Sequence, residues 1–123
     1  MSTLQTNTIQ TSNGGPVTLT KQSAAKAWVN FNSTGTLTIR SSLNTSSITD
    51  NGTGDYTENF TNSMSDADYV PQGAGQNSAN TALGLIFNPY ILAASNFRMT
   101  FINEVAAKRD GAQTNITSHG DLA

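Results

Sequence analysis

Three carboxylates lie close together in the segment SSITDNGTGDYTENF, in a chain that is otherwise poor in charge. Asp50, Asp55 and Glu58 could bind Ca²⁺, because carboxylate oxygens are its preferred ligands. In an EF-hand loop that begins at Asp50, however, two of the ligand positions would be Gly52 and Gly54, and Asp55 would stand where the loop needs glycine. The pattern fails, so the sequence predicts turn chemistry here and no metal site.

His119 is the only histidine, and Ser118 and Asp121 flank it in the chain. These residue types occur in catalytic triads, but a triad is defined by its geometry, and no nucleophile-elbow motif accompanies them. A glycosidase pair of carboxylates would need one acid with a raised pKa in a cleft. The eight acids of this chain lie mostly at predicted turns. We therefore expect no catalytic residues, no cofactor, and a protein that is not an enzyme.

Aromatic side chains with a polar atom could stack on the sugar rings of a glycan. Four such residues are present: Trp28, Tyr56, Tyr69 and Tyr90. Rings of this kind are also common at the rim of a protein core. The sequence alone leaves both alternatives open, because exposure of the rings depends on the fold.

The composition excludes several classes of partner. Lys and Arg number six and are scattered, so no basic patch for nucleic acid is predicted. The sequence contains no apolar run of about eighteen residues, so no membrane span is predicted. Leu, Ile, Val and Phe make up 24 of the 123 residues, which is a thin supply for the core of one domain. We expect the chain to complete its core by association with copies of itself.

The segment at residues 46–60 reads as a β-hairpin with strands at 46–49 and 55–60. Glycines supply permissive backbone positions in its loop, and aspartates can bond to nearby amides. The residues assigned to the turn are Asp50, Asn51, Gly52, Gly54 and Asp55.

Alternation on the second strand of this hairpin places Tyr56, Glu58 and Phe60 on one face. If that face is the core, Glu58 points inward and needs a partner. Lys26 and Arg40 are the candidates.

Alternating apolar and polar residues predict three further strands, at residues 25–32, 37–43 and 97–101. Two segments are expected to be loops. Residues 71–81 are rich in Gly, Asn and Gln, and residues 106–123 offer few bulky apolar side chains.

The run ALGLIFNPYILAA could be a buried strand or a buried helix. Pro89 argues against one continuous element, so we expect a strand that ends at Phe87, followed by a turn. Asn13 and the two glycines after it predict a tight turn between two strands near the N-terminus. The predicted fold is therefore all-β, with an antiparallel β-sandwich or barrel-like domain at residues 23–123 and an N-terminal β-hairpin arm at residues 1–22.

The motifs KAWVNFN, SSITDNGTGDYT and DADY lie between Ala25 and Val70. Over this range the sequence resembles a module of bacteriophage virion proteins, especially tail-fibre-like proteins of cyanophages and other marine phages. The resemblance implies a small β-domain on the exterior of the phage particle, assembled as a homotrimer. Two departures stand out: Glu58 replaces a residue that is usually apolar, and the chain ends in SHGDLA where the family tends to have another apolar strand.

The resemblance implies either a capsid decoration (cement) subunit or a short tail-fibre or appendage subunit that binds other virion proteins. The alternative is a fibre tip that recognises a host surface glycan. The N-terminal arm is expected to add as a strand to an exposed sheet edge of a neighbouring subunit or virion protein. The residues assigned to this contact are Thr3, Leu4, Thr6, Thr8 and Ile9.

Overall fold

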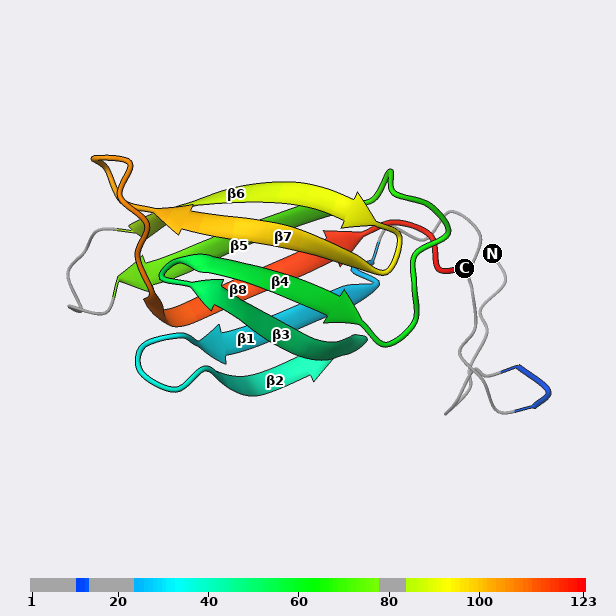
Figure 1. Cartoon of the computed structure of the whole chain (residues 1–123). Coiled ribbons are helices and arrows are strands. Elements are labelled where there is room, and N and C mark those ends of the chain that lie inside the picture. The colour runs from blue at the N-terminus through cyan, green and yellow to red at the C-terminus, as the bar shows by residue number, and fades with distance from the viewer. Residues whose placement is uncertain (1–10, 14–23, 78–83) are drawn as a thin grey trace, which may run out of the picture.

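The computed structural model describes residues 11–13, 24–77 and 84–123, and its regular elements within these ranges are all β-strands. Eight strands follow one another along the chain (Figure 1): β1 Ala27–Asn32, β2 Thr38–Leu43, β3 Thr45–Gly52, β4 Asp55–Phe60, β5 Val70–Asn77, β6 Gly84–Ala93, β7 Asn96–Ile102 and β8 Gly111–His119. The all-β class predicted from the sequence is confirmed.

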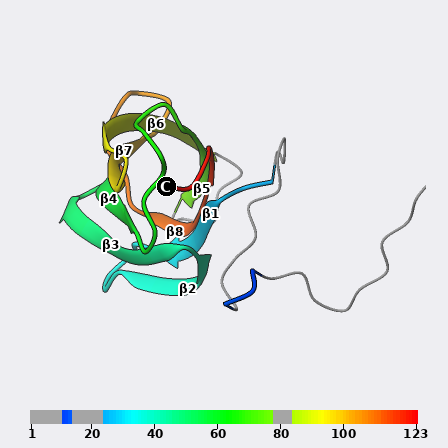
Figure 2. The same cartoon turned by 90° about the vertical axis from the view of Figure 1, so that its right-hand side faces the viewer.

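The strands form one antiparallel sheet in the order β2-β1-β8-β5-β6-β7-β4-β3. This sheet curls until its two halves, β2-β1-β8-β5 and β6-β7-β4-β3, face each other around a common core (Figure 2). The halves join at β5 and β6, which among the described residues pair only at Gly75 with Leu85 and at Gln76 with Gly84. The architecture is thus a nearly closed barrel. Of the two folds predicted from the sequence, a β-sandwich and a barrel-like domain, it matches the second.

The second junction between the halves is a sharp bend at Asn44, the single residue between β2 and β3. Asn44 has a positive φ of 57°, a conformation that asparagine tolerates better than most residues. Its side chain holds the bend, because Oδ1 accepts a hydrogen bond from the Asn62 amide at 2.7 Å and Nδ2 donates to the Asn62 carbonyl oxygen at 3.0 Å. The chain therefore pairs first with β1 and then, after one residue, with β4.

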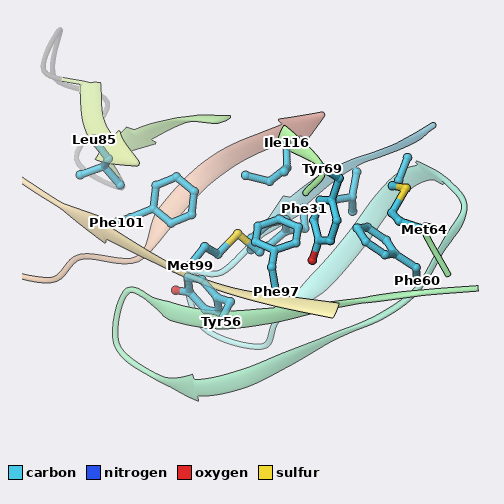
Figure 3. Packing of buried hydrophobic residues seen from close by; sticks show 12 residues of the cluster. Phe31, Tyr56, Phe60, Met64, Tyr69, Leu85, Phe97, Met99, Phe101 and Ile116 are labelled. Carbon is cyan, nitrogen blue, oxygen red and sulfur yellow. The ribbon is translucent and has the colours of Figure 1, made fainter. Parts of the chain in front are cut away.

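The core follows the alternation of the strands. The inward positions of β1 and β7 are buried, and so are Tyr56, Glu58 and Phe60 of β4, as predicted. Twelve buried apolar side chains make one cluster (Figure 3): Ala27, Val29, Phe31, Tyr56, Phe60, Met64, Tyr69, Leu85, Phe97, Met99, Phe101 and Ile116. One chain therefore supplies a continuous core, although its bulky residues are few.

The loop expected at residues 71–81 is wrong for its first part, because β5 runs from Val70 to Asn77. The glycines of this strand leave room for side chains of the facing and neighbouring strands. A Cβ atom on Gly73 would lie 2.6 Å from Ile116 Cδ1 and 2.9 Å from Phe87 Cδ2, and one on Gly75 would lie 3.1 Å from Phe101 Cδ1. Glycine gives the rings of the facing strands their space, so this strand has no apolar alternation for a sequence pattern to detect.

The turn expected after Phe87 is also wrong, since β6 continues through Pro89 to Ala93. Pro89 lies opposite Met99 of β7. Proline lacks an amide donor and is tolerated where a strand has a neighbour on one side. Within the described chain, β6 beyond Ile86 pairs with β7 alone.

The C-terminal loop expected at residues 106–123 is the third error. Residues 111–119 form β8, which lies between β1 and β5 in the sheet. Its inward residues Thr114, Ile116 and Ser118 are buried. Two of these three are polar, so the sequence pattern of this strand resembles that of a loop although the strand is inside the sheet.

Glu58 is fully buried, as alternation predicted, but its hydrogen-bond donor is a hydroxyl group. Thr45 Oγ1 donates to Glu58 Oε1 at 2.6 Å, while Oε2 has no hydrogen-bond partner among the described residues. Arg40, one of the two cations expected there, is exposed on β2.

Of the arm predicted at residues 1–22, the structure describes only residues 11–13. Thr3, Leu4, Thr6, Thr8 and Ile9 lie outside the described residues.

The packing on β5 predicts that Gly73→Ala lowers the free energy of unfolding. The added methyl group meets Ile116 and Phe87, and overpacking of this kind costs about 1–3 kcal/mol. Gly84→Ala is the matched control, since its nearest contact would be the Gly75 carbonyl oxygen at 3.8 Å. Urea unfolding of both variants checks this, and equal midpoints would contradict it.

Glu58 predicts an unusual dependence of stability on pH. Burial raises the pKa of Glu58 from 4.5 to about 7, although the Thr45 hydrogen bond lowers it in part. Between these values the native state binds more protons than the unfolded state, so stability falls as pH rises from about 4.5 to about 7 and is level above that. The loss amounts to about 3 kcal/mol. Glu58→Gln should remove this slope, and Glu58→Val should be neutral or stabilising at pH 8.

Urea unfolding of the three proteins at pH 5, 6, 7 and 8 measures the slope directly. A Glu58→Val variant that is several kcal/mol less stable than the parent at pH 8 would show that the charged carboxylate serves an essential contact.

Candidate functional site

The hairpin at residues 46–60 has the antiparallel pairing predicted from the sequence, with Ile48 opposite Glu58 and Asp50 opposite Tyr56. The first strand is longer than predicted, because Asp50, Asn51 and Gly52, which were assigned to the turn, lie in β3. Asp50 still bonds locally, since its Oδ1 accepts a hydrogen bond from the Gly52 amide at 2.9 Å. Asn51 donates across the hairpin to Thr57 Oγ1 at 2.9 Å.

The turn also docks on the segment that joins β7 to β8. Gly54 donates its amide to Asp110 Oδ1 at 2.8 Å, and its carbonyl oxygen accepts the Phe101 amide at 2.9 Å. Asp110 Oδ1 accepts a second hydrogen bond, from the hydroxyl group of Tyr56. The tip of the hairpin is therefore fixed against residues far away in the sequence.

Asp55 was assigned to the turn, and the structure places it at the centre of an ion-pair cluster. Arg98 donates to both carboxylate oxygens, from Nε at 2.7 Å and from Nη2 at 2.8 Å. Lys108 Nζ lies 2.6 Å from Oδ2. The side chain of Asp55 is 5% exposed, whereas those of Arg98 and Lys108 are 48% and 50% exposed.

These contacts fix the protonation state of Asp55. The Arg98 hydrogen bonds lower its pKa far below the ordinary value, and the Lys108 hydrogen bond adds to this against the opposing effect of burial. Asp55 is therefore charged at neutral pH, and the cluster holds two cations and one anion.

An open cleft of about 330 Å³ lies over this cluster on the outer face of β4, β7 and β6, which are neighbours in the sheet (Figure 1). Its lining residues are Asp55, Asn88, Pro89, Tyr90, Arg98, Met99, Thr100 and Lys108. Tyr90 lies opposite Arg98, and Asn88 lies opposite Thr100, so their side chains share the outer face. The cleft thus combines an aromatic ring, two cations and two neutral hydrogen-bonding groups.

The structure separates the four aromatic residues considered as sugar platforms. Tyr56 and Tyr69 are buried in the core, and the Tyr69 hydroxyl oxygen lies 2.7 Å from the Asn96 carbonyl oxygen and 2.9 Å from that of Ala93, either of which can accept its proton. Trp28 is half-buried on β1. Tyr90 is 67% exposed at the cleft. Of these four residues, Tyr90 is the one whose ring is exposed and lines a cleft.

The residues considered for a catalytic triad do not assemble. Ser118 and His119 are consecutive in β8 and point to opposite faces, with Ser118 buried in the core. His119 and Asp121 line a second cleft of about 280 Å³ with Asp66 and Asp68. No group of three or more His, Asp or Glu side chains in the described ranges is arranged to hold a metal ion.

Comparison with protein-family models, with curated proteins and with solved structures finds no match to this chain. In the part of the chain that the structure describes, no helix could span a membrane.

Sequence reasoning missed the contribution of Arg98 and Lys108. Arg98 belongs to the strand predicted at residues 97–101, where alternation opposes it to Phe97 and Met99, and this is a weak signal for a site on the outer face. Lys108 lies in a segment expected to be a loop and carries no local signal. The two residues are 43 and 53 positions from Asp55 in the chain.

The docking of the hairpin predicts that Gly54→Ala destabilises the protein strongly. Gly54 has a φ of 62°, and its added Cβ atom would lie 2.5 Å from the Arg109 amide nitrogen and 2.8 Å from the Phe101 carbonyl oxygen. Gly35→Ala is the control, because Gly35 has a φ of 74° and nothing within 4 Å.

Backbone strain alone should cost Gly35→Ala about 1 kcal/mol, and the clash with backbone atoms should add about 1–3 kcal/mol for Gly54→Ala. Urea unfolding measures both. A Gly54→Ala variant as stable as the Gly35→Ala variant would show that the hairpin tip does not depend on this contact.

Proposed function

We propose that this protein is a structural component of the surface of a phage virion. It serves as a capsid decoration subunit or as a short tail-fibre or appendage subunit, and it assembles as a homotrimer that binds other virion proteins. The proposal is supported by the resemblance of residues 25–70 to phage virion modules. That range contains β1 to β4 and reaches the first residue of β5.

The observation that carries the proposal is the open edge of β6. This strand extends to Ala93, yet it pairs with β5 only at Gly84 and Leu85. From Ile86 onward its second edge has no strand partner in the described chain, and Ile86 and Leu92 beside it are 53% and 50% exposed. A long, partly apolar strand edge is a template for pairing with another chain.

The edges of β2 and β3 are less suited to association, and the part of β5 at residues 70–74 also lacks a second strand partner among the described residues. Among the described residues, β2 and β3 each pair with one neighbour. Their exposed positions carry mostly Thr, Ser and Asn with Arg40 and Asp50, and one large apolar residue, Leu43. Charged and polar side chains discourage edge pairing. We expect the N-terminal arm of a neighbouring copy, residues 2–12, to occupy the edge of β6, because strand addition relies on backbone hydrogen bonds and tolerates a Thr-rich sequence.

Glycan recognition is a second candidate function, as in the tip of a receptor-binding fibre. The exposed ring of Tyr90 at the cleft over Asp55 favours it. A strand added at the edge of β6 leaves the outer face of the sheet open, so the two functions are compatible.

Light scattering tests the assembly. The intact chain at micromolar concentration should be a trimer, and the double variant Ile86→Lys with Leu92→Lys should raise the dissociation constant at least tenfold, because it places two charges beside the edge. Deletion of residues 2–12 should have the same effect while the circular dichroism stays β. Thr49→Lys, on the open edge of β3, is the matched control and should remain trimeric.

A stable monomer of the intact chain would overturn the assembly proposal. Gold-labelled antibody on phage particles, viewed by electron microscopy, distinguishes a capsid location from a tail location, and the absence of label from the particle would overturn the virion assignment.

A further inference from the structure

We infer that the cleft over Asp55 binds one sugar residue that carries a single anionic group, a carboxylate or a sulfate. The inference rests on the second candidate function, glycan recognition, and names the class of sugar.

The charge balance of the cleft points to an anion. Arg98, Lys108 and Asp55 are its charged lining residues, so it holds two positive charges against one negative charge. The two oxygens of Asp55 already accept three hydrogen bonds from these cations. The surplus positive charge is therefore available to a ligand, and it lies on side chains that are half exposed.

Both cations also keep free donors. Arginine has five N–H donors, and the Asp55 pair engages only Nε and Nη2 of Arg98. Lysine has three donors, of which Asp55 engages one. Asp55 fixes the positions of both side chains in advance, which reduces the entropy that a ligand must remove on binding. Charge-assisted hydrogen bonds to carboxylate or sulfate oxygens are the strong ones.

Tyr90 supplies the apolar contact that a sugar ring needs. It stands opposite Arg98 across β6 and β7 and is 67% exposed. A sugar ring presents a C–H face that packs on an aromatic ring, while its hydroxyl groups need neutral hydrogen-bonding partners. Asn88 and Thr100, the adjacent cross-strand pair, provide such partners.

The size of the cleft fits one sugar residue. Its volume of about 330 Å³ lies at the small end of the range for ligand sites. Two other clefts differ in chemistry: that of about 280 Å³ is lined by three aspartates, and that of about 230 Å³ by Gln76, Gln113 and Asn115 without a cation or a ring.

Isothermal titration calorimetry of the full chain tests the inference with four probes: trigalacturonate, a sulfated galactose disaccharide, maltotriose as a neutral sugar, and sodium acetate as an anion without a ring. Binding of trigalacturonate or the sulfated disaccharide at least tenfold tighter than maltotriose and acetate is expected. The stronger of the two identifies the anionic group. The affinity should fall as the salt concentration rises.

Variants locate the site. Tyr90→Ala and Lys108→Gln should each weaken binding of the acidic sugar at least tenfold, while Tyr90→Phe should retain it. Arg40→Gln removes one positive charge from exposed β2 and should leave binding unchanged. Circular dichroism shows that each variant is folded.

No binding of either acidic sugar at 10 mM, equal binding of maltotriose or acetate, or unchanged affinity of Tyr90→Ala would overturn the inference. These outcomes leave the assembly proposal untouched, because light scattering measures the trimer without a sugar. A monomeric chain that binds the acidic sugar would overturn the assembly proposal and leave this one standing.

Discussion

The fold depends on a match of large and small side chains across the interior of the barrel. β4, β6 and β7 contribute aromatic rings, and the rings of Phe87 and Phe101 lie close to Gly73 and Gly75 of β5. Nearby, β8 presents small side chains such as Ser118. A large inward residue on β5 would displace a ring. This match helps a chain with few bulky residues to form a continuous core, because the rings of Phe87 and Phe101 fill the space that the two glycines leave.

The same match explains which parts of the fold the sequence could predict. β1, β4 and β7 have apolar inward residues at every second position or nearly so, and alternation located all three. β5 and β8 have glycine, threonine and serine at inward positions, which single-sequence patterns assign to loops because the same residues also favour turns. The strand end predicted before Pro89 was wrong for a related reason, because proline is also tolerated inside a strand that has one neighbour. The information that distinguishes these cases lies in the facing strands.

The candidate site was predictable only in part, because its members come together through the sheet order. The hairpin loop was evident from its glycines and aspartates. Asp55, which ends that predicted loop, instead contacts Arg98 on β7 and Lys108 on the connection between β7 and β8. The docking of Gly54 on Asp110 brings that connection beside the hairpin. Asp55 could therefore be singled out from the local sequence, whereas the positions of Arg98, Lys108 and Tyr90 beside it follow from the order of the strands in the sheet.

Glu58 connects the core to the bend at Asn44, where β2 passes into β3. Thr45 Oγ1 lies 2.6 Å from Glu58 Oε1 and 3.3 Å from the Trp28 carbonyl oxygen of β1. A hydroxyl group has one proton to donate. When Glu58 is ionised, Thr45 must give that proton to the carboxylate, and the contact with Trp28 is not a hydrogen bond. When Glu58 is protonated, it can donate to Thr45, whose own proton is then free for Trp28. One added proton on Glu58 thus permits a chain of hydrogen bonds from β4 through β3 to β1, across the bend where the two halves of the sheet meet.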